Sequence, residues 1–187
     1  MHISITHLPY ASKLEMRDIG AIQLIVVHCT ELPSLQIARQ FGEQAPYPSG
    51  TGNSGHYYID RDGSTQEYVP IDRIAHHTRG WNPKSIGIEL INLGRYPNWL
   101  DSRSQQMTEP YPPAQIEALV ELIADLRRRC AALTDIAGHE DLDLTEVPAS
   151  DDANLVVRRK RDPGPMFPWA EVIARCGLRR RMAAQLP

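Results

Sequence analysis

The stretch QLIVVHCTE, residues 23–31, decides how the rest of the chain is interpreted. Residues 24–27 form a run that is apolar on both sides and rich in β-branched side chains, which is typical of a central strand buried on both faces. The run ends in His28 instead of another core residue. An imidazole at a strand end, where the chain turns into a loop, can face a pocket, but one histidine does not establish a site.

The composition suits one globular domain. The chain has 187 residues, of which 42% are hydrophobic and 23% charged, enough to bury a sizeable core. Its net charge is −3, so no overall basic field favours nucleic acid or an anionic membrane as a partner. An odd number of cysteines without a CxxC pair fits reduced thiols better than a disulfide framework. These are Cys29, Cys130 and Cys176.

The N-terminal segment carries no sign of secretion. Residues 1–20 lack the basic start and the apolar run of a signal peptide, and no apolar stretch approaches the roughly 18 residues of a membrane span. We therefore expect a soluble protein in a cytoplasmic setting without a membrane span. A periplasmic setting, or delivery outside the cell by a signal-independent route, is the alternative.

Strand and helix signals alternate along the chain, which is typical of an α/β domain. A hairpin is predicted around Asp62 and Gly63, and SIGIELIN, residues 85–92, predicts a second buried strand. Three helices are predicted at residues 33–42, 113–132 and 169–176, the first with Leu35, Ile37, Ala38 and Phe41 on its apolar face. We expect residues 179–187 to form a frayed polar tail.

A second histidine repeats the arrangement of the first. Residues 133–141, LTDIAGHED, predict a short strand that ends in His139. A sheet can bring His28 and His139 to one edge although they lie far apart in the sequence. Each histidine alone is more often structural, but metal and ligand sites gather where strand ends and their loops converge. The pair therefore favours a site at this edge.

Asp162 is the candidate third member of this site. It precedes Pro163 in RRKRDPGP, and the proline ring disfavours helical backbone for the residue before it. Two neutral imidazoles and one carboxylate form a ligand set for catalytic zinc, with a fourth position left for water or substrate. A simple turn aspartate is an equally good interpretation of Asp162 taken alone.

Two further charged residues are candidates for catalysis. Glu89 lies in the predicted buried strand 85–92, where a carboxylate needs either an ion pair, for example with an arginine, or a role as general acid/base. Lys160 lies two residues before Asp162, so on extended backbone both side chains point to the same side, and its ammonium could stabilise an oxyanion. Alternatively, residues 158–161, RRKR, form a solvated basic run or a weak nucleic-acid patch.

Five motifs follow one another in the order IVVHCT, GHYYIDRDGSTQEYVP, RIAHHTRGWNPKSIGIEL, IAGHEDL and RRKRDPGPMFPW. Together they resemble the zinc-dependent N-acetylmuramoyl-L-alanine amidases of the type 2 family, which are related to peptidoglycan recognition proteins. The resemblance covers about residues 20–175 of a domain expected to span residues 1–178. It implies a mixed central β-sheet flanked by α-helices, one Zn²⁺ per chain, and hydrolysis of the amide between N-acetylmuramic acid and L-alanine in peptidoglycan or muropeptides.

The resemblance also assigns roles to single residues. It matches zinc ligands at His28, His139 and Asp162, catalytic residues at Glu89 and Lys160, and a histidine that lies along the substrate groove of relatives at His77. A peptidoglycan-binding module without catalysis is the alternative, but such relatives lack the third ligand. A protein that binds nucleic acid through RRKR is disfavoured by the net charge of −3. The sequence does not identify a protein partner.

One residue and the length of one segment depart from the family pattern. Relatives often have a tryptophan where this chain has His76, and their path from the second histidine to the aspartate is usually shorter. The extra length, about residues 140–159, could form a rim over the site or a partner surface. It also contains four rival ligands, Asp141, Asp143, Asp151 and Asp152. Asp162 is preferred because the proline turn and Lys160 accompany it.

Overall fold

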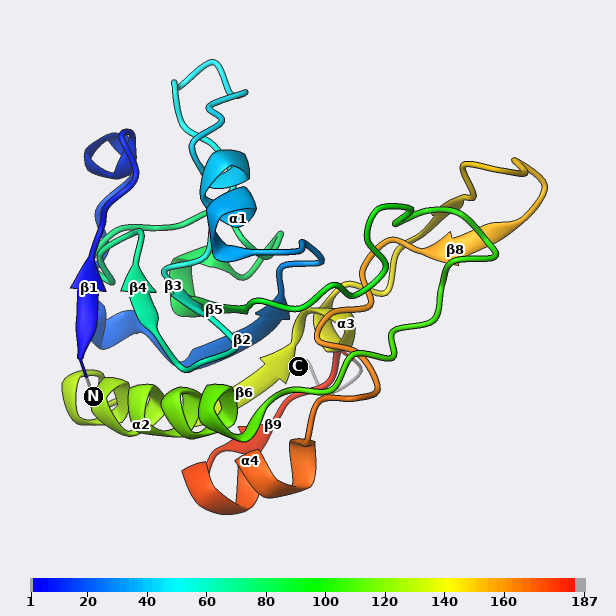
Figure 1. Ribbon diagram of the computed structural model, residues 1–187. Coiled ribbons are helices and arrows are strands. Elements are labelled where there is room, and N and C mark those ends of the chain that lie inside the picture. Colours follow the sequence, from blue (N-terminus) through cyan, green and yellow to red (C-terminus); the bar gives the residue numbers. More distant parts are fainter. Residues whose placement is uncertain (1, 184–187) are drawn as a thin grey trace.

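The computed structural model, which describes residues 2–183, places a seven-stranded sheet between α1 on one face and α2 and α4 on the other (Figure 1). The strand order is β1-β4-β3-β5-β2-β6-β9. The strands are β1 (Ile3–Ile5), β2 (Leu24–Cys29), β3 (Tyr57–Ile59), β4 (Thr65–Glu67), β5 (Ser85–Leu90), β6 (Asp135–Gly138) and β9 (Arg179–Arg180). The helices are α1 (Leu35–Gly42), α2 (Pro113–Arg129), α3 (His139–Leu142) and α4 (Trp169–Cys176), with short 3-10 turns at Ala11–Lys13, Ile19–Ala21 and Asn82–Lys84.

The sheet is mixed, as the family resemblance implies. β2 pairs in parallel with β5 and β6, whereas β3 and β4 form the antiparallel hairpin predicted around Asp62 and Gly63. Gly63 has a φ of 88°, a left-handed conformation that glycine adopts without steric cost. The predicted α/β fold class, with a mixed central sheet flanked by helices, is confirmed.

Alternate side chains of β2 pack on opposite faces of the sheet. Ile25 and Val27 belong to the main core that α2 and α4 cover, while Leu24 and Val26 face the other side. His28 follows Leu24 and Val26 in this alternation and therefore shares their face. The side chain of His28 thus lies on the face of the sheet opposite to α2.

Two features of the helices differ from the sequence predictions, and a third agrees with them. α2 ends at Arg129, earlier than residue 132, because Cys130 leaves helical dihedral angles. Phe41 does not join the buried face of α1 as predicted, since it is 47% exposed while Ala38 is buried. α4 ends as predicted at Gly177, which adopts the left-handed conformation typical of a helix C-cap.

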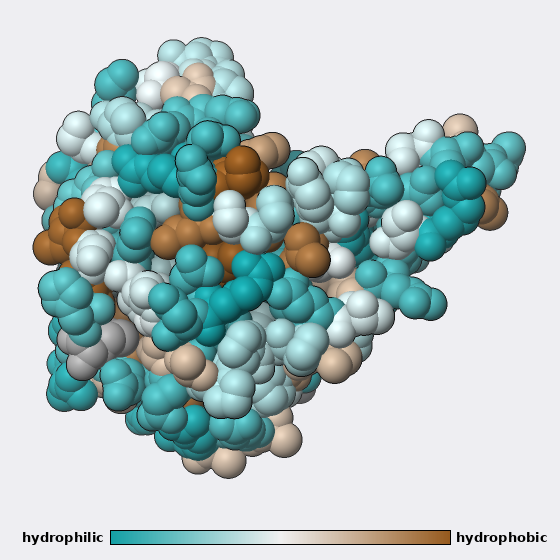
Figure 2. All heavy atoms as spheres, viewed as in Figure 1, coloured by the Kyte–Doolittle hydropathy of each residue, from teal (hydrophilic) through white to brown (hydrophobic). Residues whose placement is uncertain are grey.

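The extra segment between the second histidine and Asp162 forms a projecting arm (Figure 1). Its strands β7 (Glu146–Pro148) and β8 (Val156–Arg158) make an antiparallel hairpin that is separate from the main sheet. The loop after β5 runs along this hairpin, where the backbone N–H of Ser150 donates to the carbonyl of Leu100. The arm's surface in the same view is mostly hydrophilic (Figure 2). Its role as a rim or partner surface stays a prediction.

The C-terminal prediction needs a correction. Residues 179–187 were expected to form a frayed tail, but Arg179–Arg180 form β9, which pairs in parallel with β6. Residues 184–187 lie outside the described residues. Within residues 2–183, no helix combines the length and the apolar character needed to cross a membrane. The predicted cytoplasmic setting and domain limits stay predictions.

Candidate metal centre

Parallel pairing of strands brings the predicted ligands together. β2 and β6 pair with Val27 opposite Gly138, so the next residues, His28 and His139, are neighbours whose ring centroids lie 4.7 Å apart. The Oδ2 atom of Asp162 lies 2.9 Å from Nδ1 of His28 and 3.2 Å from Nδ1 of His139. One possible ligand atom from each of the three residues lies within 4.8 Å of the others. All three side chains are buried.

The chemistry of this cluster fits a metal ion. Oδ1 of Asp162 and Nε2 of His139 are buried without a hydrogen-bond partner, although buried polar atoms in proteins are normally paired. Burial lowers the pKa of His28 to about 4, which keeps its imidazole in the neutral form that binds metals. Burial alone would raise the pKa of Asp162, but His139 and His28 hold it well below its usual range. The site therefore offers the neutral imidazole of His28, the imidazole of His139 and the carboxylate of Asp162.

The four rival aspartates are occupied elsewhere. Asp141 forms two hydrogen bonds of 3.0 and 2.9 Å with the guanidinium of Arg180, and it also accepts from the backbone N–H of Gly138. This pair ties strand β9 to the start of α3, where His139 lies. The remaining three accept hydrogen bonds as follows: Asp143 from Arg159, Asp151 from Ser102, and Asp152 from Asn154. Among the described residues, Asp162 is the aspartate that joins the two histidines.

Glu89 faces the cluster from the neighbouring strand. It is opposite His28 in the pairing of β2 with β5, and its Oε1 lies 4.0 Å from His28 Nδ1. The side chain is 15% exposed, and none of the described arginines forms an ion pair with it. Burial, together with the charge of Asp162, raises the pKa of Glu89 to about 8, while Lys160 acts in the opposite direction. Such a carboxyl group can exchange a proton near neutral pH.

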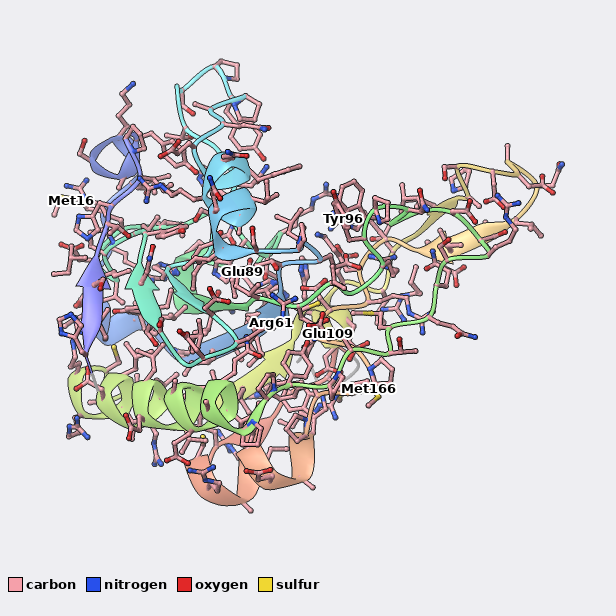
Figure 3. The ribbon with its side chains drawn as sticks, viewed as in Figure 1. Met16, Arg61, Glu89, Tyr96, Glu109 and Met166 are labelled. Atoms are coloured by element: carbon pink, nitrogen blue, oxygen red, sulfur yellow. The ribbon has the colours of Figure 1, made fainter. Side chains whose placement is uncertain are left out.

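One cavity of about 480 Å³ joins the predicted residues. Its lining includes His28, His77, Glu89, His139, Lys160 and Asp162. A second cavity of about 290 Å³ also touches Glu89 and Lys160 and continues along α1, where the exposed Phe41 lines it. Glu89 lies close to α1 in Figure 3. The two cavities together can take an extended ligand across the cluster of His28, His139 and Asp162.

His77 contacts the ring nitrogen of His28 that points away from Asp162. When Nδ1 of His28 binds a metal, its Nε2–H can donate to Nδ1 of His77, 3.1 Å away. Nε2 of His77 can then donate to Oγ of Ser85 at 3.2 Å, and that hydroxyl donates to the carbonyl of Trp81 at 2.8 Å. Gly87 leaves room for this ring, because a Cβ there would lie 2.5 Å from Cγ of His77. The predicted groove role of His77 stays a prediction, and the structure adds a contact between His77 and the candidate ligand His28.

Replacing His77 with alanine is expected to weaken metal binding about 10–100-fold, because the variant removes the acceptor that orients the His28 ring. The measurement is a competition titration with a chromophoric chelator, using Zn²⁺ as the probe. His7→Ala is the matched control, since His7 is more exposed and contacts Glu67, outside the cavity lining. Equal affinities of the two variants would contradict this supporting role.

One support of Asp162 has no signal in the sequence. The hydroxyl of Tyr111 donates to the carbonyl of Pro163 at 2.7 Å, next to Asp162 in the chain. Tyr111 lies just before α2 in an irregular segment, where no periodicity marks a buried side chain. Its contact depends on tertiary packing between residues 52 positions apart.

Comparison with known families agrees with this geometry. Residues 18–165 match the family model for N-acetylmuramoyl-L-alanine amidase, a span that contains His28, His139 and Asp162 as well as Glu89 and Lys160. The chain belongs to this amidase family. The two histidines and the aspartate that converge in the structure therefore lie in the region that matches a family named for amide hydrolysis.

Curated members of the family resemble this amidase-family chain over part of their length. AmiD of Escherichia coli (strain K12) is 32% identical over 115 residues, which are 57% of this chain and 36% of AmiD. AmpD of Enterobacter cloacae, named a 1,6-anhydro-N-acetylmuramyl-L-alanine amidase, is 34% identical over 121 residues, or 60% of this chain and 51% of AmpD. The matched region thus spans about a third to a half of these relatives.

Solved structures share the fold. A selenomethionine derivative of AmpD superposes with a TM-score of 0.64 at 27% identity, covering 92% of this chain and 93% of AmpD. AmiD from E. coli, solved with anhydro-N-acetylmuramic acid-L-Ala-D-γ-Glu-L-Lys, has a TM-score of 0.62 at 25% identity and covers 85% of this chain and 58% of AmiD. Drosophila PGRP-LB, at 20% identity and a TM-score of 0.61, shares the fold alone, with coverage of 92% and 93%.

Proposed function

We propose that this chain is a zinc-dependent amidase that hydrolyses the amide bond between N-acetylmuramic acid and L-alanine in peptidoglycan or muropeptides. The observation that carries the proposal is that His28, His139 and Asp162 converge in the cavity that Glu89 also lines. Membership of the amidase family and similarity to AmiD, solved with an anhydro-muramyl peptide substrate, support it. AmpD-type relatives, named for the anhydro sugar, add muropeptides to the candidate substrates.

Zinc is the metal proposed for this site because two imidazoles and one carboxylate form a known catalytic zinc ligand set with one position left open. When bound, the ion would supply Lewis-acid chemistry that activates water near neutral pH and polarises a carbonyl oxygen. His28, His139 and Asp162 would hold it, and His77 would orient the ring of His28 through the Nε2–Nδ1 hydrogen bond.

Glu89 serves as the general acid/base in this proposal. Its carboxylate form accepts a proton from the attacking water, and its protonated form then delivers that proton to the amine of L-alanine as it leaves. A pKa raised to about 8 by burial allows the group to do both near neutral pH. Its position opposite His28, with Oε1 4.0 Å from Nδ1 of that ring, supports this assignment.

Lys160 is assigned to the oxyanion. Lys160 lines the same cavity, and its positive charge acts to lower the pKa of Glu89, His28 and Asp162. A fixed positive charge beside the carbonyl oxygen stabilises the tetrahedral oxyanion that forms when water attacks. The neighbouring arginines do not behave as a free basic run, because Arg158 donates to the carbonyls of Glu140 and Asp143. This contact disfavours the nucleic-acid alternative.

The test is a side-by-side digestion of purified muropeptides, anhydro-muropeptides and intact sacculi, with products identified by mass spectrometry. We expect release of peptides that begin with L-alanine, loss of this activity after treatment with a chelator, and recovery on addition of Zn²⁺. A protein that binds these ligands without releasing peptide would instead be a recognition module. Activity that resists complete metal removal would contradict the zinc assignment.

A further inference from the structure

Glu31 and Arg95 form a buried ion pair that has no part in the mechanism above. Glu31 lines the same cavity as His28, His139 and Asp162. Nε of Arg95 lies 2.6 Å from Oε1 of Glu31, and its second terminal nitrogen lies 2.8 Å from Oε2. The two side chains are only 1% and 8% exposed. Glu31 follows His28 by three positions, whereas Arg95 lies in the loop after β5. The pair therefore joins the exit of β2 to that loop.

The same guanidinium also holds a third segment. The Nη1 atom of Arg95 donates to the carbonyl of Arg158 at 2.9 Å, and Nη2 donates to the carbonyl of Arg159 at 3.3 Å. These are the two residues directly before Lys160. A planar guanidinium can bind a carboxylate and neighbouring carbonyls at once, which the single ammonium of lysine cannot reproduce. One side chain thus ties the strand that carries His28 to the segment that carries Lys160.

The surrounding backbone is shaped around this pair. Glu31 has a φ of 50°, an unusual conformation for a residue other than glycine. Gly94 packs against it so closely that a Cβ there would lie 2.6 Å from Cγ of Glu31. The indole N–H of Trp99 donates to the carbonyl of Glu31 at 3.0 Å. A strained residue held by several independent contacts is often found where a site requires one geometry.

Stability alone does not account for this pair. Bringing two charges out of water costs free energy that their attraction often fails to exceed, so an apolar pair of similar size would serve the fold about as well. Lys160, in contrast, needs outside support, since its ammonium forms no hydrogen bond or ion pair with the residues described here. A long, flexible side chain is then positioned mainly by the backbone that carries it.

We propose that Glu31 and Arg95 are positioning residues that fix the backbone before Lys160 and so hold its ammonium at the reacting carbonyl. The assignment rests on the proposed amidase function. Asp162 has separate supports, because its carbonyl accepts from the backbone N–H of Glu140 at 2.9 Å and Tyr111 holds the next residue. We call the ion pair of Glu31 and Arg95 the brace. It therefore positions Lys160 more than it positions Asp162.

The first test is Arg95→Lys, which keeps the positive charge beside Glu31 but removes the forked donors. We expect kcat for the muropeptide to fall about 10–100-fold while KM and Zn²⁺ affinity stay within about threefold of the native values. The matched control is Arg127→Lys, because Arg127 also donates to a backbone carbonyl, that of Cys176, but is not one of the residues that line the cavity. A folded Arg95→Lys variant with native kcat would overturn the proposal.

A double-mutant cycle separates positioning from general loosening of the fold. If Arg95 acts through Lys160, Lys160→Met and the double variant Arg95→Lys/Lys160→Met have the same kcat, because the second change removes nothing further. Losses that multiply in the double variant would show that Arg95 acts elsewhere and would overturn the proposal. Glu31→Gln, which keeps the shape of the partner, is expected to reproduce the Arg95→Lys effect if that variant does not fold.

Amide hydrogen exchange tests the brace without relying on turnover. We expect faster exchange at residues 158–162 in Arg95→Lys than in the native protein or in Arg127→Lys, since the guanidinium no longer holds the carbonyls of Arg158 and Arg159. Unchanged exchange in that segment would overturn the proposal. If the native protein releases no peptide from any muropeptide, the amidase function fails, and this measurement still decides whether the brace exists.

Discussion

A Glu89→Gln variant should bind one Zn²⁺ per chain and yet release L-alanyl peptides about 10²–10⁴ times more slowly than the native protein. Glutamine keeps the size of the side chain but can neither accept the proton of the attacking water nor deliver it to the leaving amine. Glu89 is not one of the three clustered ligands, so the metal stays. Metal content measured by mass spectrometry, together with single-turnover hydrolysis of a purified muropeptide, checks both halves of this prediction.

The matched control is Glu140→Gln. Burial, together with Asp141, raises the pKa of Glu140 to about 7, so it shares the unusual titration of Glu89 but does not line the cavity. We expect its turnover to stay close to the native value. If both variants lose activity equally, the effect comes from the electrostatics of the region instead of proton transfer by Glu89.

The pH profile provides a second readout for Glu89. Its carboxylate form is the base, so kcat/KM is expected to rise as the pH increases through the pKa of Glu89. That pKa is about 8 without a metal, and a bound cation nearby shifts it downward by favouring the charged form. The acidic limb should therefore have its midpoint below about 8 and should disappear in Glu89→Gln. A limb that persists in the variant belongs to another group.

An Asp162→Ala variant is expected to lose both stoichiometric zinc and hydrolysis. Removing a ligand should cost more than the roughly 10–100-fold typical of losing a supporting hydrogen bond, because it takes away the one anionic member of the cluster. Equilibrium dialysis against buffered Zn²⁺ measures the loss. In the metal-free protein, circular dichroism checks that the chain still folds.

Asp151→Ala is the control for Asp162, because Asp151 was a rival ligand but lies on the arm and binds Ser102. We expect it to retain zinc and activity. If Asp162→Ala still holds one firmly bound zinc, the three-residue cluster is not the metal site, and the zinc assignment fails with it.

The cluster of His28, His139 and Asp162 was predictable because it depends on local patterns and on one topological rule. The apolar strands that end at His28 and His139 are visible in the sequence, and parallel neighbours end at the same edge of a sheet. Asp162 is marked by its proline turn and by the family resemblance. Glu89 is visible as a carboxylate in an otherwise apolar strand. Each signal lies within a few residues of the side chain it identifies.

The supports of the cluster were not predictable, because they join residues without any local signal. Glu31 and Arg95 lie 64 positions apart and look like ordinary surface charges in the sequence. Strand β9 contains two arginines and no apolar alternation, so the sequence predicts a tail at this position instead of a strand. The β7–β8 hairpin also lacks a turn signal as clear as that at Gly63. Only the folded chain shows which charges are buried together.

Strand β9 has a practical consequence for how this protein is handled in the laboratory. Arg180 binds Asp141, which in turn accepts from the N–H just before His139, so a chain shortened to end before Arg180 loses a contact that leads directly to the metal cluster. The opposite edge of the sheet is β1, far from this region in strand order. Affinity tags and fused reporter domains are therefore better attached before β1 than close behind β9.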